Sequence, residues 1–195
     1  LPNATFTEIN YYKSDFLQKR LGLLPDKRII LHSGGLGVWF KSKELAESTV
    51  NWPDNTVLVF HTSHKVDDDG YYQEISKKGY NGKVVFSTKP VSTYELDSLV
   101  CSATIGIALY SKEILGYRAE LMGLAAGKIG NYLKCGLPVI ATKTLSFQYI
   151  TDYKCGVLVE NEPEITGAMA IILNAYDEFS TNAKRCYKEL WEPSK

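Results

Sequence analysis

A glycine-rich turn, Ser33-Gly34-Gly35-Leu36-Gly37, follows a short apolar run and precedes a predicted helix. Glycines let the backbone approach a phosphate closely, and successive amide groups in such a turn can bind an anion. The turn is not a dinucleotide fingerprint, because the last glycine of G-x-G-x-x-G is missing, and no Walker lysine follows it. The pattern therefore predicts either a phosphate-binding turn or a plain tight turn between a strand and a helix.

Lysines at the starts of two predicted helices are further candidates for binding a phosphate. Lys41 begins the helix predicted over Lys41–Val50, and Lys128 lies in the first turn of another helix. A cation at a helix N-terminus opposes the helix dipole at a cost of about 0.3–1 kcal/mol, which favours a functional role over a structural one. The alternative is an ordinary exposed lysine at either position.

Metal and thiol chemistry has weaker support in the sequence. The acids of Asp67-Asp68-Asp69 precede a predicted helix, where capping of its amide groups is the favoured interpretation. His61 and His64 with Asp67 could ligate a metal, but a polar turn fits them better, and His32 fits a packed strand histidine. The four cysteines have no C-x-x-C spacing and are expected to be free thiols; they are Cys101, Cys135, Cys155 and Cys186.

The elements that must position these residues alternate between strands and helices. Gly136 suits a helix-ending left-handed position, and Pro138 blocks continuation of the helix before the apolar strand that follows. Strands are predicted at Arg28–Ser33, Thr56–Thr62, Lys83–Ser87, Thr104–Tyr110, Pro138–Thr142 and Gly156–Glu160. Helices are predicted between them and, at the end of the chain, over Pro163–Phe179 and Thr181–Trp191. The pattern predicts an α/β fold, a Rossmann-like doubly wound parallel sheet of about six strands with helices on both faces.

Size and charge restrict the class of protein. The 195 residues suit one domain, and the formal net charge of zero gives no support to nucleic acid as a partner. The longest apolar runs are far short of a membrane span. We expect a cytoplasmic protein, with peripheral membrane association as an alternative. Because the chain starts at Leu1 rather than Met, we expect sequence upstream of it. The least structured stretch is expected at Ser111–Gly123, as a loop over the ligand cleft.

The run from Lys128 to Ala141 resembles a specific family. It reads Lys128-Ile129-Gly130-Asn131-Tyr132, then Gly136 and Pro138-Val139-Ile140-Ala141, and is similar to the K-I-x-E-Y-x-x-x-G-x-P-V-I-A run of family 4 glycosyltransferases of the GT-B fold. The resemblance extends over nearly the whole chain. It implies a hinge and lead-in helix over residues 1–27, including Pro2-Asn3, and a nucleotide-sugar-binding domain over residues 28–195, the C-terminal donor lobe without its N-terminal acceptor lobe.

Several residues depart from the pattern of that family. Gly35 stands where the family has an arginine that contacts the donor diphosphate, and Lys41 or Lys43 would be the lysine that follows it. Both acids of the E-x7-E signature are replaced: Asn131 stands where the family has the glutamate that binds the ribose hydroxyls, and Gly123 stands where it has the acid that contacts the donor sugar. Glu113 or Glu120 could take over a catalytic role from the loop. By resemblance, the donor-binding residues are Gly34, Gly35, Gly37, Lys41, Thr88, Lys89, Ser111, Lys128, Ile129 and Asn131.

The resemblance implies transfer of a hexosyl or related group from a nucleotide-diphosphate sugar to a glycan or lipid-linked acceptor, with retention of configuration. No cofactor and no obligatory metal are expected, and the isolated lobe should bind more than it catalyses. Two alternatives stay open. One is a nucleotide-sugar 2-epimerase of the same fold, and the other is a degenerate lobe kept for interaction, which the two replaced acids favour.

Overall fold

The computed structural model of the chain describes residues 12–63 and 70–192. Some features considered in the sequence lie outside the described residues: Pro2-Asn3, His64 and the acids Asp67-Asp68-Asp69.

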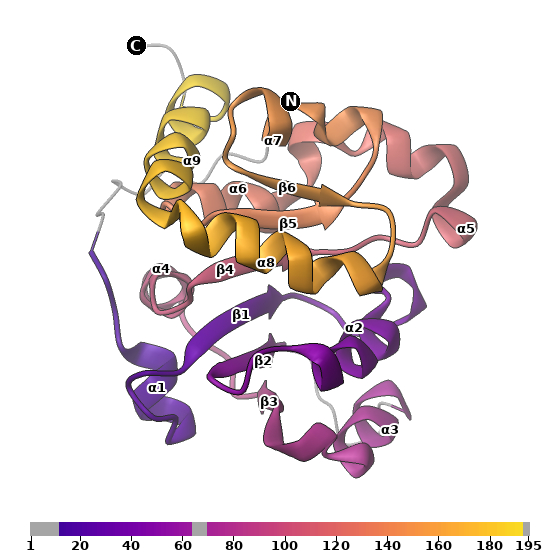
Figure 1. Cartoon of the computed structure of the whole chain (residues 1–195), viewed down its shortest axis with the longest axis vertical. Helices are drawn as coiled ribbons and strands as arrows, with labels where there is room; N and C mark the ends of the chain where they lie inside the picture. The colour runs from indigo at the N-terminus through magenta and orange to yellow at the C-terminus, as the bar shows by residue number, and fades with distance from the viewer. Residues whose placement is uncertain (1–11, 64–69, 193–195) are drawn as a thin grey trace.

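Six parallel strands form one sheet in the order β3-β2-β1-β4-β5-β6 (Figure 1). The strands are β1 (Arg28–Ser33), β2 (Thr56–His61), β3 (Val84–Ser87), β4 (Ile105–Ala108), β5 (Val139–Thr142) and β6 (Gly156–Val159). In the centre of the sheet, Ile30 of β1 is in register with Leu58 of β2 on one side and with Ile105 of β4 on the other. The predicted fold class and number of strands are confirmed.

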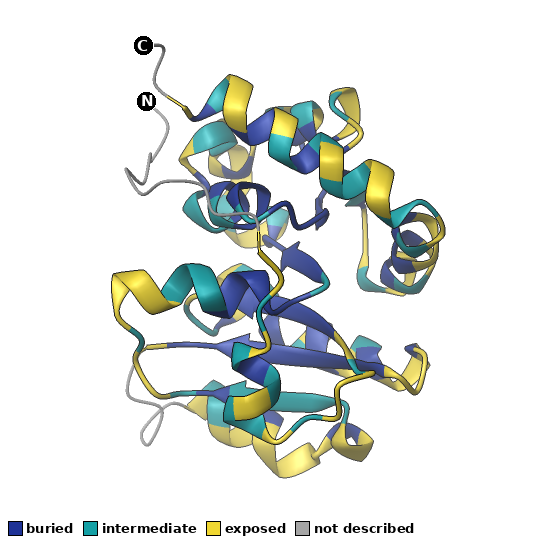
Figure 2. Cartoon of the chain, turned by 90° about the vertical axis from the view of Figure 1, so that its left-hand side faces the viewer, coloured by how far each residue is buried: buried dark blue, intermediate teal, exposed yellow. Residues whose placement is uncertain are grey.

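Helices cover both faces of this sheet, as the two layers of ribbon in Figures 1 and 2 show. The α-helices are α1 (Phe16–Leu21), α2 (Ser42–Ser48), α3 (Gly70–Lys78), α4 (Thr93–Cys101), α5 (Lys112–Leu115), α6 (Gly127–Lys134), α7 (Gln148–Asp152), α8 (Ile165–Asn174) and α9 (Tyr176–Leu190). The short 3-10 helices are η1 (Val38–Phe40), η2 (Thr49–Asn51), η3 (Tyr80–Gly82), η4 (Gly116–Leu121), η5 (Gly123–Ala125), η6 (Leu145–Phe147) and η7 (Glu162–Glu164).

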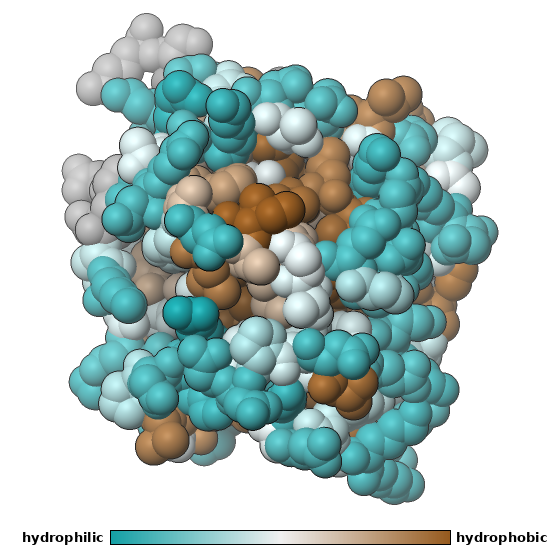
Figure 3. Space-filling view, in the orientation of Figure 1, coloured by the Kyte–Doolittle hydropathy of each residue, from teal (hydrophilic) through white to brown (hydrophobic). Residues whose placement is uncertain are grey.

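Alternate residues of each strand point to opposite faces, so the sheet separates two cores. In β1, Ile29 and Leu31 pack in the core beneath α1, α4, α6, α7 and α9, whereas Ile30 packs in the core beneath α2, α3 and α8. Because both faces are covered, the four inner strands are mostly apolar and buried, whereas the outer strands β3 and β6 are only partly buried (Figure 2). The α8 face of the molecule shows apolar residues near its centre (Figure 3). Ile171 of α8 is one of the exposed large hydrophobic residues.

Two local predictions were wrong. The stretch Ser111–Gly123, expected to be a loop, contains α5 and η4, because the Ser111 side chain caps α5 by accepting a hydrogen bond from the Ile114 amide. The last two helices are divided at Ala175 rather than near Ser180. The division lies there because α8 and α9 pack on opposite faces of the sheet, so the chain must change direction as it passes the amino end of β4, where Tyr176 donates to the Thr104 carbonyl.

The order of the strands reverses between β1 and β4. The chain after β1 leads to α2 on one face, and the chain after β4 leads to α6 on the other. The two segments therefore diverge at the carboxyl ends of neighbouring strands, which is where open parallel sheets bind ligands. Within the described ranges, no helix has the length and apolar character needed to cross a membrane.

Candidate functional site

The glycine-rich turn directly after β1 holds two unpaired amide groups. The Gly34 amide donates to the His61 carbonyl at 2.9 Å, and the Gly37 amide donates to Ser42 Oγ at 3.1 Å. Between them, the amides of Gly35 and Leu36 have no acceptor among the described residues. Gly34 and Gly37 have φ angles of 130° and 146°, in the region that favours glycine. The turn is therefore held at both ends and leaves two donors available in its middle.

The Lys128 ammonium lies beneath this turn. A Cβ atom added at Gly34 would be 3.5 Å from Lys128 Nζ, although the two residues are far apart in sequence. The same Nζ lies 3.4 Å from Nε2 of His32 and 4.2 Å from the centroid of the Phe40 ring, with the Tyr110 ring at 5.6 Å. Lys128 forms no ion pair with any residue in the described part of the chain. The site is therefore a cation without a counter-charge.

Burial makes this cation costly. Part of the Lys128 residue is exposed, but its ammonium lies among protein atoms, and this desolvation lowers the pKa of the amine to about 7. Burial lowers the pKa of His32 well below its ordinary value, and the nearby Lys128 charge lowers it further. The hydrogen bond between His32 Nε2 and the Gly35 carbonyl, at 3.1 Å, acts in the opposite direction but is the smallest of the three effects. His32 is therefore neutral, and Lys128 is half-protonated near neutral pH. An anion bound here would restore the charge balance.

Tyr132 fixes the end of β1 against β4. Its hydroxyl accepts a hydrogen bond from the Ser33 amide at 2.8 Å and donates to the Ile107 carbonyl at 3.4 Å. The ring packs against Gly106 of β4, where an added Cβ would be 2.3 Å from Tyr132 ring carbons. The absence of a side chain at Gly106 therefore leaves room for this tyrosine from α6 to reach Ser33, the first residue of the glycine-rich turn.

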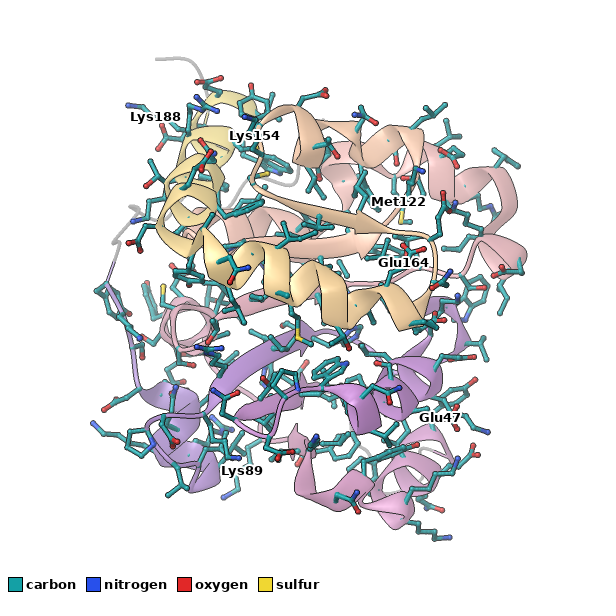
Figure 4. All side chains as sticks on the ribbon, viewed as in Figure 1. Glu47, Lys89, Met122, Lys154, Glu164 and Lys188 are labelled. Atoms are coloured by element: carbon teal, nitrogen blue, oxygen red, sulfur yellow. The ribbon has the colours of Figure 1, made fainter. Side chains whose placement is uncertain are left out.

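A cavity of about 240 Å³ extends from the turn toward α4. Its lining comprises Ser33, Gly34, His61, Ser63, Val91, Ser92, Thr93 and Leu96. The predicted residues Thr88 and Lys89 do not line it; the carbonyl of Lys89 accepts a hydrogen bond from Arg20 of α1, and Lys89 itself is exposed (Figure 4). The segment after β3 that borders the cavity is therefore the start of α4, where Ser92 and Glu95 form a capping box.

Lys41 and Ser111 lie on the other side of the turn, in contacts of their own. Lys41 adopts a left-handed conformation with φ 50° and pairs with Glu162 at 2.7 Å. Lys43, the alternative, pairs with Glu74. Ser111 is buried, its amide donates to the Trp39 carbonyl at 2.9 Å, and its hydroxyl donates to Glu113 at 2.8 Å. The structure thus brings Lys128, not Lys41, to the glycine turn.

The remaining predicted residues have mixed positions. Asn131 follows Lys128 by three residues on α6, on the same side of the helix, and is partly exposed. Ile129 is fully buried, so its side chain packs in the core and cannot contact a ligand. Glu120 accepts a hydrogen bond from the Leu145 amide at 2.7 Å, which ties η4 to η6. The interactions of Glu113 and Glu120 support the loops, and nothing in the geometry directs either carboxylate to the turn.

Four residues of the site were missed in the sequence: His32, Phe40, Tyr110 and Tyr132. A histidine on an otherwise apolar strand, two residues before Gly34, was the one available signal. The aromatic residues carry no such signal, because aromatic side chains at strand and helix ends are ordinary core residues.

Comparison with solved structures places the fold. The C-terminal domain of LpcC, a group 1 glycosyltransferase family protein from Francisella tularensis, superposes with a TM-score of 0.67 and 16% sequence identity, over 94% of this chain and 97% of that domain. This chain has the fold of a GT-B glycosyltransferase C-terminal domain. The sequence itself matches no protein-family model and no curated protein.

Two further structures show the same C-terminal fold within larger proteins. HepE from Anabaena, in complex with UDP and glucose, matches with a TM-score of 0.69 at 16% identity, over 95% of this chain and 51% of that protein. TarM from S. aureus, in a variant complexed with UDP among other ligands, matches with a TM-score of 0.67 at 14% identity, over 96% of this chain and 35% of that protein. The chain thus spans about half of HepE and about a third of TarM.

Proposed function

We propose that this chain is the donor-binding lobe of a glycosyltransferase and binds the diphosphate of a nucleotide sugar at the turn after β1. One observation carries the proposal: the Lys128 ammonium has no carboxylate partner among the described residues and lies beneath a turn with two unpaired amides, at the strand-order reversal of this fold. The GT-B fold, and the UDP bound to the HepE and TarM structures, support the assignment.

The site supplies the chemistry that a diphosphate requires. The amides of Gly35 and Leu36 can donate to phosphate oxygens, and the protonated Lys128 supplies the opposite charge in a poorly solvated setting. Hydrogen bonds to charged groups contribute about 1.5–3 kcal/mol each, roughly twice the value of neutral ones. Binding of the diphosphate would also hold the proton on Lys128, because a neighbouring negative charge raises the pKa of an amine.

Transfer of the sugar rests on the resemblance to the glycosyltransferase family. The acids that the resembled family uses are replaced by Gly123 and Asn131, and Asn131 offers an uncharged acceptor to a ribose hydroxyl. The hexosyl donor, the retention of configuration, the glycan or lipid-linked acceptor and the contribution of an N-terminal lobe follow from the resemblance. Independence from a cofactor and from a divalent metal is part of the same proposal. The replaced acids favour a second candidate, a lobe that binds a nucleotide without transferring the sugar.

Titration of the chain with UDP by calorimetry tests the binding step. We expect weak binding that is equal in magnesium and in EDTA, and loss of at least tenfold in affinity for Lys128→Met. Lys188→Met is the matched control, because Lys188 is an exposed lysine on α9 (Figure 4), and it should bind as the parent does. Equal affinities of the parent and Lys128→Met would overturn the proposal.

Release of UDP from UDP-glucose by the full-length protein separates the two candidates. Release that depends on an added acceptor supports transfer. Binding without release, with or without acceptors, supports the lobe that only binds.

A further inference from the structure

The four cysteines form two pairs of neighbouring thiols. Cys101 and Cys135 line one cavity and lie close enough for each thiol to shift the pKa of the other, and Cys155 and Cys186 form a second close pair. All four are free thiols. Cys101 is the last residue of α4, and Cys135 directly follows α6, so the first pair connects the ends of two neighbouring helices.

The first pair lines a cavity of about 490 Å³. The cavity lies at the amino ends of the strands, since its lining includes Arg28 at the start of β1, Thr104 just before β4 and Leu137 just before β5. It is therefore at the opposite edge of the sheet from the Lys128 site. Cys135 is partly exposed and Cys101 is 4% exposed, whereas Cys155 and Cys186 are both fully buried and do not line this cavity.

The cavity carries more positive than negative charge. Its charged lining residues are Lys13, Asp26, Lys27, Arg28 and Lys184. Lys184 also reaches across the helix end, since an added Cβ at Gly136 would be 2.5 Å from its Cε. The buried Lys134 forms an ion pair at 2.6 Å with the partly exposed Asp97, and the Cys135 thiol donates to the Asp97 carbonyl at 3.7 Å. These surroundings favour an anionic molecule in the cavity.

The two thiols differ in acidity. The neighbouring Cys135 thiol has the largest effect on the pKa of Cys101 and lowers it; burial and Asp97 raise it, and Lys134 and Lys184 lower it by smaller amounts. The contact with Cys101 and burial raise the pKa of Cys135. Because the thiolate is the nucleophile in thiol–disulfide exchange, the first attack belongs to Cys101.

We propose that Cys101 and Cys135 form an oxidisable dithiol site that reacts with a small anionic disulfide, of which oxidised glutathione is the test compound. After losing its proton to water, the Cys101 sulfur attacks one sulfur of the disulfide, and one glutathione thiolate leaves and takes a proton. Cys135 then loses its proton and attacks the Cys101 sulfur, and the second glutathione leaves in the same way. The protein dithiol gives up two electrons, the glutathione disulfide accepts two, and two glutathione thiols result.

The experiment incubates the chain with oxidised glutathione, alkylates the remaining thiols and identifies linked peptides by mass spectrometry. The expected product is a Cys101–Cys135 disulfide, with Cys155 and Cys186 recovered as alkylated thiols only after denaturation. The buried pair is an internal control, because it has the same thiol–thiol contact without the cavity. Recovery of Cys101 and Cys135 as alkylated thiols, or oxidation of both pairs at one rate, would overturn the proposal.

A variant isolates the first step. Cys135→Ser removes the resolving thiol, so glutathione should stay attached at Cys101, whereas Cys155→Ser should still form the Cys101–Cys135 disulfide. Circular dichroism of each variant checks that it is folded. A folded Cys135→Ser chain that retains no glutathione would contradict the proposal, and the unmodified chain tests it even where a variant does not fold.

Discussion

Replacement of Lys128 by methionine should make the protein more stable while it removes nucleotide binding. Methionine has nearly the length of the lysine stem and can keep the contacts with Phe40 and Tyr110, but it carries no charge. The expectation rests on the position of the ammonium, which lies near the turn and His32 without a carboxylate among the described residues.

The size of the effect follows from the pKa. Lys128 has its pKa lowered from the ordinary 10.5 to about 7 by burial. One pKa unit corresponds to about 1.4 kcal/mol, so holding the charged form costs at most about 4–5 kcal/mol near neutral pH. Part of this is offset by the attraction between the ammonium and the aromatic rings, about 0.5–2 kcal/mol, which methionine loses. We therefore expect Lys128→Met to raise the free energy of unfolding by about 2–4 kcal/mol at pH 7.

The pH dependence of the free energy of unfolding tests the sign of the Lys128→Met effect a second time. The unfolded chain keeps the Lys128 proton up to about pH 10, whereas the folded chain loses it near pH 7. Because the unfolded state binds more protons between these values, this group makes the parent more stable as the pH rises from 7 to 10. The cost of the buried charge is complete below pH 7. The advantage of Lys128→Met should therefore be largest at or below pH 7 and should shrink toward pH 10.

Urea unfolding at pH 6, 7, 8 and 9 measures both quantities without screening the charges. Lys188→Met again serves as the control, because an exposed lysine should change the free energy of unfolding by less than about 0.5 kcal/mol. A Lys128→Met protein that is no more stable than the parent at pH 7, or whose advantage does not change with pH, would refute the view that Lys128 is a destabilising charge kept for binding.

Further predictions concern the same site and its support. The affinity for UDP should decrease as the pH rises above 7, because the free lysine loses the proton that the bound diphosphate retains; calorimetry in buffers of different ionisation enthalpy should show proton uptake, absent in Lys128→Met. Asn131→Glu should strengthen UDP binding by about 1 kcal/mol and Asn131→Leu should weaken it by a similar amount, through gain of charge assistance or loss of an acceptor; three equal affinities would remove Asn131 from the site. Gly35→Arg should tighten binding, since a bidentate cation would face the diphosphate; unchanged or weaker binding in the same titration would contradict this. Gly106→Ala should destabilise the fold by about 1–3 kcal/mol or more, because its methyl group would overlap the Tyr132 ring; an unfolding midpoint equal to that of the parent would show that the ring can move aside.

The order of strands and helices could be predicted because apolar runs and helix-ending glycines are local features of the sequence. Apolar runs such as Ile29–Leu31 can be buried only in strands covered on both faces, and Gly22, Gly79 and Gly136 mark the places where helices end in a left-handed turn. The boundary between α8 and α9 could not be read in the same way. The residues on either side of Ala175 do not include a glycine or a proline that would end a helix, so the division depends on which face of the sheet each helix covers.

The candidate site was likewise predicted in part from the sequence and decided in part by the tertiary structure. Sequence alone pointed to the glycine turn and to Lys128, because glycines at that spacing and a cation opposing a helix dipole both need a local explanation. Which lysine reaches the turn was decided by the tertiary structure: Lys41 is neutralised by Glu162 from the other end of the chain, whereas α6 brings Lys128 under Gly34. The depressed pKa of Lys128 likewise exists only in the folded protein, because desolvation requires His32, Phe40 and Tyr110 to converge from separate segments around one ammonium.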